Sequence, residues 1–250
     1  MRGYVQIKRS LKRVVPDSVI SVVRSAKVAT RLGLLFPWVA TLRNIGRKAR
    51  FGTDYGGWTI PADGVTAQSI CYCVGCGEDI SFDLELIRHY SCTVYAFDPT
   101  PRSVEFVRNA AAGIAGYRFA DVGIWDRDGT VKFFVPRDSR HVSHSITNLQ
   151  GTDAYLEVPT RRLREVLREH GHRRLTLLKL DIEGAENTVI QTILEDAIPI
   201  DILLVEFDEL GFPTPERIAQ IKSSIHSLLR HGYELFNIAN TNFTFVLARA

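Results

Sequence analysis

Three groups of polar residues in this sequence can do chemistry, and each directly follows a short apolar run. The first group is the segment Gly75 to Asp79, which carries a second glycine at Gly77 and follows the apolar run Ile70 to Val74. A glycine lets the backbone turn sharply and approach a ligand closely, because it has no Cβ. A Gly-x-Gly pair after a strand is typical of nucleotide-binding loops, but alone it is a weak signal.

The second group supports a nucleotide-like ligand. Asp98 closes the next apolar run, Thr93 to Phe97, 23 residues after Gly75, and an acid at this place commonly accepts hydrogen bonds from ribose hydroxyls. The third glycine of the dinucleotide fingerprint is absent, and the following helix opens with Glu78 and Asp79 instead. Two acidic side chains at a helix N-terminus would repel a pyrophosphate, whereas they are compatible with a sulfonium methyl donor, which has no phosphate. The pattern therefore favours S-adenosylmethionine over NAD, although both acids can also simply stabilise the helix.

The third group consists of acids after two further apolar runs. Asp181, Glu183 and Glu186 follow the run Leu175 to Leu180, while the next run ends at Glu206, Asp208 and Glu209. A carboxylate within reach of a hydroxyl can remove its proton, and oxygen ligands from two strand ends can hold Mg²⁺. The simpler alternative is that Asp181 and Glu183 only hydrogen-bond the backbone and the amino group of the donor.

The order of the apolar runs predicts the elements that position these groups. Strands are expected at residues 70–74, 93–97, 117–120, 131–135, 175–180, 200–207, 233–238 and 243–247. Helices are expected after Ile80, from Thr100 with Pro101 in the first turn, from Thr160 to Gly171, from Glu183 to Glu195 and from Thr214. This alternation predicts an α/β fold: a Rossmann-like, doubly wound, mainly parallel sheet with a C-terminal antiparallel hairpin. Because ligands of such sheets bind beyond the carboxyl ends of the strands, the three groups should meet at one edge.

The charge distribution separates a basic N-terminal extension from the rest of the chain. Residues 1–50 carry twelve Lys and Arg residues against one acid, Asp17, whereas residues 51–250 carry 19 bases and 27 acids. We expect a partly helical extension at 1–50 and one Rossmann-like domain at 51–250. The extension can contact an anionic membrane surface or an acidic partner, or be a solvated arm, and nucleic acid is a weaker candidate. The oligomeric state is not predicted.

Two kinds of sequence feature indicate the cellular compartment of the protein: targeting signals and cysteines. The longest apolar run of the extension, Leu32 to Leu42, contains Pro37 and is too short to span a bilayer, so no transmembrane helix is expected. No secretory signal is expected either, while an Arg-rich transit peptide stays open. The four cysteines, Cys71, Cys73, Cys76 and Cys92, lack the partners of a zinc site and are expected to be buried and reduced. This favours a cytoplasmic chain, with peripheral membrane contact through the extension as an option.

Several of these segments resemble the methyltransferase family known as FkbM. The resemblance lies in Leu178 to Glu186, Cys73 to Asp83, Ala96 to Pro101, Gly123 to Gly129 and His144-Ser145, and it extends from about Tyr55 to Leu247. The glycine loop departs from the commoner family form, which has an Asn and a second Gly after the first one. The resemblance implies an S-adenosylmethionine-dependent O-methyltransferase that acts on a hydroxyl of a sugar, glycan or related natural product.

The resemblance also implies roles for individual residues. The donor would contact Gly75, Cys76, Gly77, Glu78, Asp98, Asp121 and Asp181, and the catalytic candidates are Glu183, Asp181 and His144. Asp181 and Glu183 are further similar to acids of metal-dependent sugar O-methyltransferases, in which the first acid binds a divalent ion and the second is the base. Magnesium would then be held by Asp181, Glu206 and Asp208. The alternatives that the residues leave open are a nicotinamide-dependent dehydrogenase and a catalytically silent adaptor with a basic arm.

Overall fold

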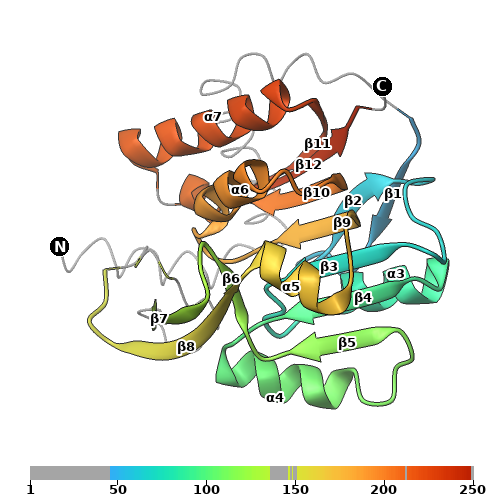
Figure 1. The fold of residues 1–250 in the computed structure, drawn as a ribbon, viewed down its shortest axis with the longest axis horizontal. Coiled ribbons are helices and arrows are strands. Elements are labelled where there is room, and N and C mark those ends of the chain that lie inside the picture. Colours follow the sequence, from blue (N-terminus) through green and yellow to red (C-terminus); the bar gives the residue numbers. More distant parts are fainter. Residues whose placement is uncertain (1–45, 136–145, 147, 149–150, 212, 249–250) are drawn as a thin grey trace, which may run out of the picture. The chain divides into compact units, whose positions relative to one another are not determined.

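The computed structural model describes residues 46–135, 146, 148, 151–211 and 213–248, all within one compact unit that spans Arg43–Ala250. A seven-stranded sheet forms its centre, with the order β11-β12-β10-β9-β3-β4-β5 (Figure 1). Its strands are β3 (Ile70–Val74), β4 (Thr93–Phe97), β5 (Tyr117–Ala120), β9 (Leu175–Leu180), β10 (Ile200–Glu206), β11 (Tyr233–Ala239) and β12 (Asn242–Leu247). The α/β fold with a mainly parallel sheet is therefore confirmed.

The chain builds this sheet outward from its middle. β3, β4 and β5 are parallel neighbours in one direction, and β9 and β10 extend the sheet in the other. The C-terminal hairpin then places β12 antiparallel to β10, with β11 at the edge. The strand order consequently reverses between β3 and β9, which is where a doubly wound sheet opens a crevice for a ligand.

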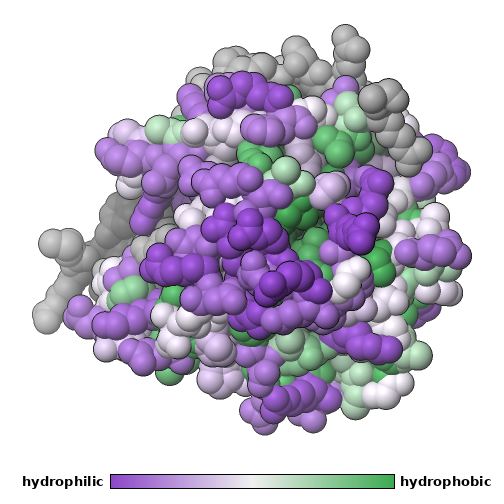
Figure 2. Space-filling model, viewed as in Figure 1, coloured by the Kyte–Doolittle hydropathy of each residue, from purple (hydrophilic) through white to green (hydrophobic). Residues whose placement is uncertain are grey.

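Both faces of the sheet are covered. The helices are α3 (Ser81–Tyr90), α4 (Pro101–Ala110), α5 (Leu163–His170), α6 (Glu186–Glu195) and α7 (Pro215–Arg230), with a short 3₁₀ helix, η2 (Asp208–Gly211). A hairpin of β1 (Lys48–Phe51) and β2 (Trp58–Pro61) packs with α3 on one face, in a core that includes Cys71, Cys73 and Leu177. The opposite face carries α5, α6 and α7, and hydrophilic side chains cover much of its outer surface (Figure 2). Two-sided cover explains why the strands read as continuous apolar runs.

Three sequence-based expectations were wrong in detail. Thr160 does not cap a helix but lies in a strand that was not predicted, β8 (Tyr155–Arg162), and α5 begins at Leu163. Helix α6 begins at Glu186 rather than at Glu183, because Glu183 and Gly184 have φ angles of 55° and 93°, which no α-helix accommodates. Lys48 and Arg50 of the expected extension lie in β1.

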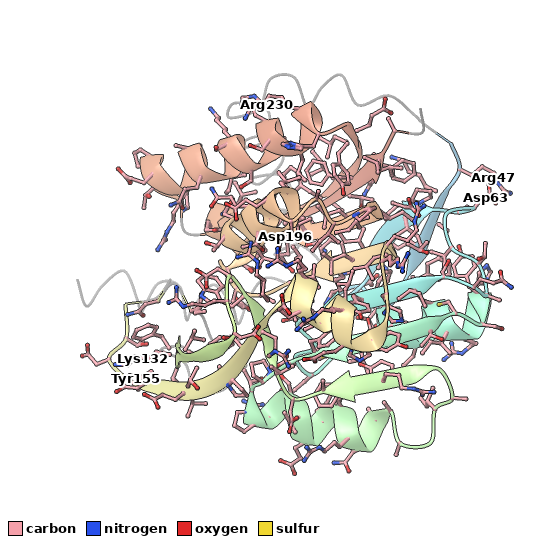
Figure 3. All side chains as sticks on the ribbon, in the orientation of Figure 1. Arg47, Asp63, Lys132, Tyr155, Asp196 and Arg230 are labelled. Carbon is pink, nitrogen blue, oxygen red and sulfur yellow. The ribbon has the colours of Figure 1, made fainter. Side chains whose placement is uncertain are left out.

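A second, three-stranded sheet joins β8 to β6 (Gly123–Trp125) and β7 (Gly129–Phe134). The hairpin of β7 and β8 extends beyond the main sheet, and its Lys132 ammonium lies 4.1 Å from the centre of the Tyr155 ring (Figure 3). Arg162 ties this sheet to α6, since its guanidinium contacts the Asp196 carboxylate at 2.7 and 3.0 Å. The Asp196 side chain is only 5% exposed, so this ion pair is well shielded from water.

The described residues test two further expectations, which concern the burial of the cysteines and a membrane-spanning helix. Cys71, Cys73, Cys76 and Cys92 are all buried and free, as expected. Within the described ranges, no helix is long and apolar enough to cross a membrane.

The backbone of Gly75 approaches that of Asp181 closely where β3 and β9 end side by side. Its φ is +86°, and a Cβ built on it would lie 1.7 Å from the Asp181 carbonyl oxygen. The Gly75 N–H donates to Phe97 O at 2.9 Å, and the Asp181 N–H donates to Val74 O at 3.1 Å. Neither strand end can therefore move away to admit a side chain.

Gly75→Ala is expected to lower the free energy of unfolding by more than about 3 kcal/mol, because it adds a backbone clash to an unfavourable φ. Gly113→Ala is the matched control, since Gly113 has a φ of +72° but no atom within 4 Å of the added Cβ. The control should lose only about 1–2 kcal/mol. Urea unfolding of both variants measures the difference, and equal losses would show that the contact with Asp181 is unimportant.

Candidate active site at the carboxyl edge of the sheet

Asp98, directly after β4, organises the glycine loop that follows β3. Its side chain is buried, and Oδ2 accepts hydrogen bonds from the N–H groups of Cys76 at 2.9 Å and Gly77 at 3.1 Å. Oδ1 accepts from the Thr100 N–H at 2.9 Å and the Thr100 hydroxyl at 2.7 Å. Four donors fill the accepting capacity of one carboxylate. Asp98 thus joins two loops, and a ribose hydroxyl that reaches it has to share or replace one of these donors.

Glu78 and Asp79 were expected to open the helix, but α3 begins at Ser81 and both acids lie in the loop before it. Glu78 forms a half-exposed ion pair with Arg102 of α4 at 2.7 Å. Asp79 accepts from the Ser81 N–H at 2.9 Å and from the Thr53 hydroxyl. Partial burial acts to raise the pKa of Asp79, but the hydrogen bonds from Ser81 and Thr53 outweigh it and lower that pKa. Asp79 therefore contacts the first residue of α3, as the helix-stabilising alternative requires, whereas Glu78 pairs with α4 instead.

A buried lysine that the sequence reasoning missed connects the glycine loop to the acids after β9. The Lys179 ammonium donates to Gly75 O at 2.7 Å and lies 3.0 Å from Asp181 Oδ2. Burial acts to lower the pKa of Lys179, but the charges of Asp181 and Asp83 outweigh it, so the pKa is raised and the cation persists. The signal in the sequence was a single lysine inside the apolar run Leu175–Leu180, since a buried lysine needs a partner.

The loop from Asp181 to Ala185 is held by the first residue of α6. The Glu186 side chain is fully buried, and its carboxylate accepts from the Ile182 N–H at 2.6 Å and the Gly184 N–H at 2.9 Å. Glu183 lies between these two anchors with a φ of 55°, a left-handed conformation that is uncommon for a side chain other than Gly, Asn or Asp. The fold therefore holds Glu183 in place at the edge of the sheet.

Carboxylates from the ends of β9 and β10 come together at this edge, as the sequence predicted. Burial and the nearby Asp181 and Glu183 raise the pKa of Glu206 to about 8, although the Thr241 hydroxyl donates to its Oε1 at 2.7 Å. Burial, followed by Glu183 and Glu206, also raises the pKa of Asp208 well above its ordinary value. One oxygen of Asp208 is buried without a hydrogen-bond partner. We call Asp181, Glu183, Glu206 and Asp208 the acidic edge.

The remaining predictions concern Asp121, His144 and the expected magnesium ligands. Asp121 follows β5 and forms an exposed ion pair with Arg108 at 2.9 Å. His144 lies outside the described residues. Asp181, Glu206 and Asp208 do not form a metal site, since no group of three or more His, Cys, Asp or Glu side chains in the described ranges could hold a metal ion.

The comparisons with known proteins agree with the FkbM resemblance. A family model described as the methyltransferase FkbM domain matches residues 70–235, from the start of β3 into β11. The search of curated proteins finds no match.

Solved structures give only distant similarity. The pre-rRNA processing protein fibrillarin of Methanococcus jannaschii has a TM-score of 0.43 at 9% identity, covering 73% of this chain and 67% of that one. Fibrillarin of Aeropyrum pernix, in complex with natively bound S-adenosyl-L-methionine, has a TM-score of 0.42 at 11% identity, with 82% and 83% covered. The N-methyltransferase NodS of Bradyrhizobium japonicum, in complex with S-adenosyl-L-homocysteine, has a TM-score of 0.35 at 11% identity, with 72% and 79% covered.

The raised pKa of Glu206 predicts a pH-dependent stability. Because the pKa is raised from 4.5 to about 8 on folding, this contribution is fully present below pH 4.5 and is lost as the pH rises through 8. Glu206→Gln cannot ionise, so at pH 9 it should be more stable than the wild type by about 1–3 kcal/mol, and similar to it at pH 5. Urea unfolding in EDTA measures this, with exposed Glu157→Gln as the control. Equal stability of Glu206→Gln and the wild type at pH 9 would contradict the repulsion.

Proposed function

The chain belongs to the FkbM methyltransferase family and is an S-adenosylmethionine-dependent methyltransferase, and from this premise we propose that its acceptor is a hydroxyl of a sugar, glycan or related natural product. The observation that carries the proposal is the contact of Lys179 with both Gly75 and Asp181. Lys179 lies 2.7 Å from Gly75 O and 3.0 Å from Asp181 Oδ2, which supports a proposed donor loop, Gly75 to Asp79, beside the acidic edge. A methyl donor on the loop and an acceptor hydroxyl at the acidic edge would then be neighbours.

The residues of the donor side fit S-adenosylmethionine. The loop from Gly75 to Gly77 offers a close backbone approach, and Asp98 keeps it in shape. Glu78, paired with Arg102, and Asp121 are the further proposed contacts. The donor, when bound, supplies an activated methyl group. The protein's contribution is to hold the acceptor oxygen in line with that group, which lowers the entropy cost of the transfer.

Removal of the hydroxyl proton is assigned to the acidic edge. Lys179 forms an ion pair with Asp181, and we assign Asp181 to orienting the acceptor or donor. Glu183 is held in place by the anchored loop and is the proposed base, which would remove the proton as the methyl group is transferred. His144 is the next candidate for this role.

Activation of the acceptor hydroxyl by a divalent ion is a second version of the proposed mechanism. Carboxylate oxygens are the ligands that Mg²⁺ prefers, and a bound cation would relieve the repulsion that raises the pKa values of Glu206 and Asp208. As the structure stands, Asp181, Glu206 and Asp208 are not arranged as a metal site, so in this version they would supply the ligands only after closing around the ion. The two versions predict different responses to a chelator.

Asp98→Ala is expected to weaken binding of S-adenosylmethionine by about 1.5–3 kcal/mol, because it removes a charge-assisted acceptor from the donor site. Calorimetric titration measures the affinity. Hydrogen exchange of the Cys76 and Gly77 amides without donor measures how far the loop loosens. An unchanged affinity in a folded variant would contradict a role for Asp98 in donor binding.

Glu183→Gln is expected to keep the affinity for S-adenosylmethionine and to lower kcat by at least about a hundredfold, because a positioned base supplies a factor of about 10²–10⁴. Transfer of a labelled methyl group to a panel of methyl glycosides measures turnover, with Glu157→Gln as the distant control. Wild-type turnover by Glu183→Gln would show that Glu183 is not the base.

In the metal version, EDTA should reduce the turnover of the wild type to that of Asp181→Asn, and added magnesium should restore turnover only in the wild type.

A further inference from the structure

An exposed tyrosine stands at the edge of the proposed site. Tyr55 is 85% exposed, the highest value among the large hydrophobic side chains of the described ranges; the next is Tyr155 at 44%. It lies at the tip of the turn from Gly52 to Gly57, which connects β1 to β2 and which we call the Tyr55 turn. The proposed donor contacts and the acidic edge leave this residue without a role.

The Tyr55 turn is fixed to the first turn of α3. The Gly52 N–H donates to Glu85 Oε2 at 2.7 Å, and the Thr53 N–H donates to Ser81 Oγ at 2.9 Å. The Thr53 hydroxyl donates to Asp79 and accepts from the Gly56 N–H at 3.0 Å. These bonds position the backbone on both sides of Tyr55.

The glycines of the turn permit its tight packing. A Cβ on Gly56 would lie 2.7 Å from Asp79 Oδ2, and a Cβ on Gly57 would lie 2.4 Å from Thr53 O. The guanidinium of Arg50 also donates to the carbonyl oxygens of Gly52 at 3.1 Å and Thr53 at 2.8 Å. The turn is thus a rigid support for a solvent-exposed ring.

The position of Tyr55 relative to the site follows from its neighbours. Its turn rests on Asp79, the last residue of the donor loop. Partial desolvation, followed by the charges of Asp181, Glu183, Glu206 and Asp208, raises the pKa of Tyr55, so the phenol is within electrostatic range of the acidic edge. The phenol therefore stays protonated near neutral pH and can donate a hydrogen bond.

We propose that Tyr55 binds the acceptor, with its ring packed against the apolar C–H face of a sugar and its hydroxyl donating to a sugar oxygen. The proposal rests on the proposed function and adds a residue that determines acceptor specificity. A tyrosine ring is apolar over its faces and polar at one end, which matches a sugar that carries C–H groups on a face and hydroxyls at its edges. A rigid support lowers the entropy cost of ordering such a contact.

The test compares Tyr55→Phe and Tyr55→Leu with the wild type. Tyr155→Leu is the matched control, because Tyr155 is the other exposed tyrosine of the described residues and lies beside Lys132 on the β7–β8 hairpin (Figure 3). Its ring also contacts Phe134. Methyl transfer from labelled S-adenosylmethionine to a panel of methyl glycosides gives KM and kcat, and calorimetry gives the donor affinity. Thermal unfolding checks that each variant is folded.

We expect Tyr55→Leu to raise KM for the glycoside at least about tenfold, with kcat changed less than about threefold and the donor affinity unchanged, because only acceptor binding is lost. Tyr55→Phe keeps the ring and loses one hydrogen bond, so its KM should rise by about threefold to fivefold. Tyr155→Leu should behave as the wild type.

The outcomes separate this inference from the proposed function. If the wild type methylates a glycoside and Tyr55→Leu keeps its KM, the inference is wrong while the function stands. A weaker donor affinity in Tyr55→Leu would place the ring on the donor instead and also overturn the inference. If the wild type methylates no glycoside in the panel, the sugar acceptor itself is contradicted, and with it the sugar contact of Tyr55.

Discussion

The arrangement of the site depends on the buried ammonium of Lys179, which contacts both Gly75 and Asp181. Desolvation of an ammonium costs several kcal/mol, and the protein offsets this cost with the Gly75 carbonyl and the carboxylates of Asp181 and Asp83. The lysine belongs to β9, whereas Gly75 belongs to the loop after β3. Any displacement of one strand end against the other would leave a buried charge without a partner. The crevice at the reversal of strand order is therefore held by electrostatics as well as by the close backbone contact at Gly75.

Around this cation the site divides into two sides with opposite electrostatic design. On the proposed donor side, Asp98 accepts four hydrogen bonds and Glu78 has an arginine partner, so each charge is satisfied within the protein. On the proposed acceptor side, burial and the charge of Glu183 raise the pKa values of Glu206 and Asp208. Like charges held together cost stability, and such costs are typical of sites where protons or cations are handled.

The hairpin before β3 reaches the proposed donor side. It packs into the core through Trp58 and Ile60, and the Tyr55 turn joins Asp79 of the donor loop through Thr53. An element at the start of the domain thus contacts the glycine loop after β3. The proposed acceptor contact of Tyr55 would make it part of specificity as well as of folding.

The sequence by itself determined the order of the main-sheet strands and of the α-helices, the glycine loop after β3 and the convergence of acids at one edge, because apolar periodicity and turn residues act over a few positions. Tertiary structure alone decided what each polar group contacts: Lys179 reaches Gly75 across 104 positions, and Asp98 reaches Cys76 across 22. It also decided that Thr160 extends a strand paired with β6 and β7, where local propensity favoured a helix cap. Glu183 lies outside α6 for a similar reason, since the buried Glu186 carboxylate accepts hydrogen bonds from the Ile182 and Gly184 amides on either side of it. Partners distant along the chain leave no periodic signal, so a pattern can locate a charged residue but does not identify the group that compensates its charge.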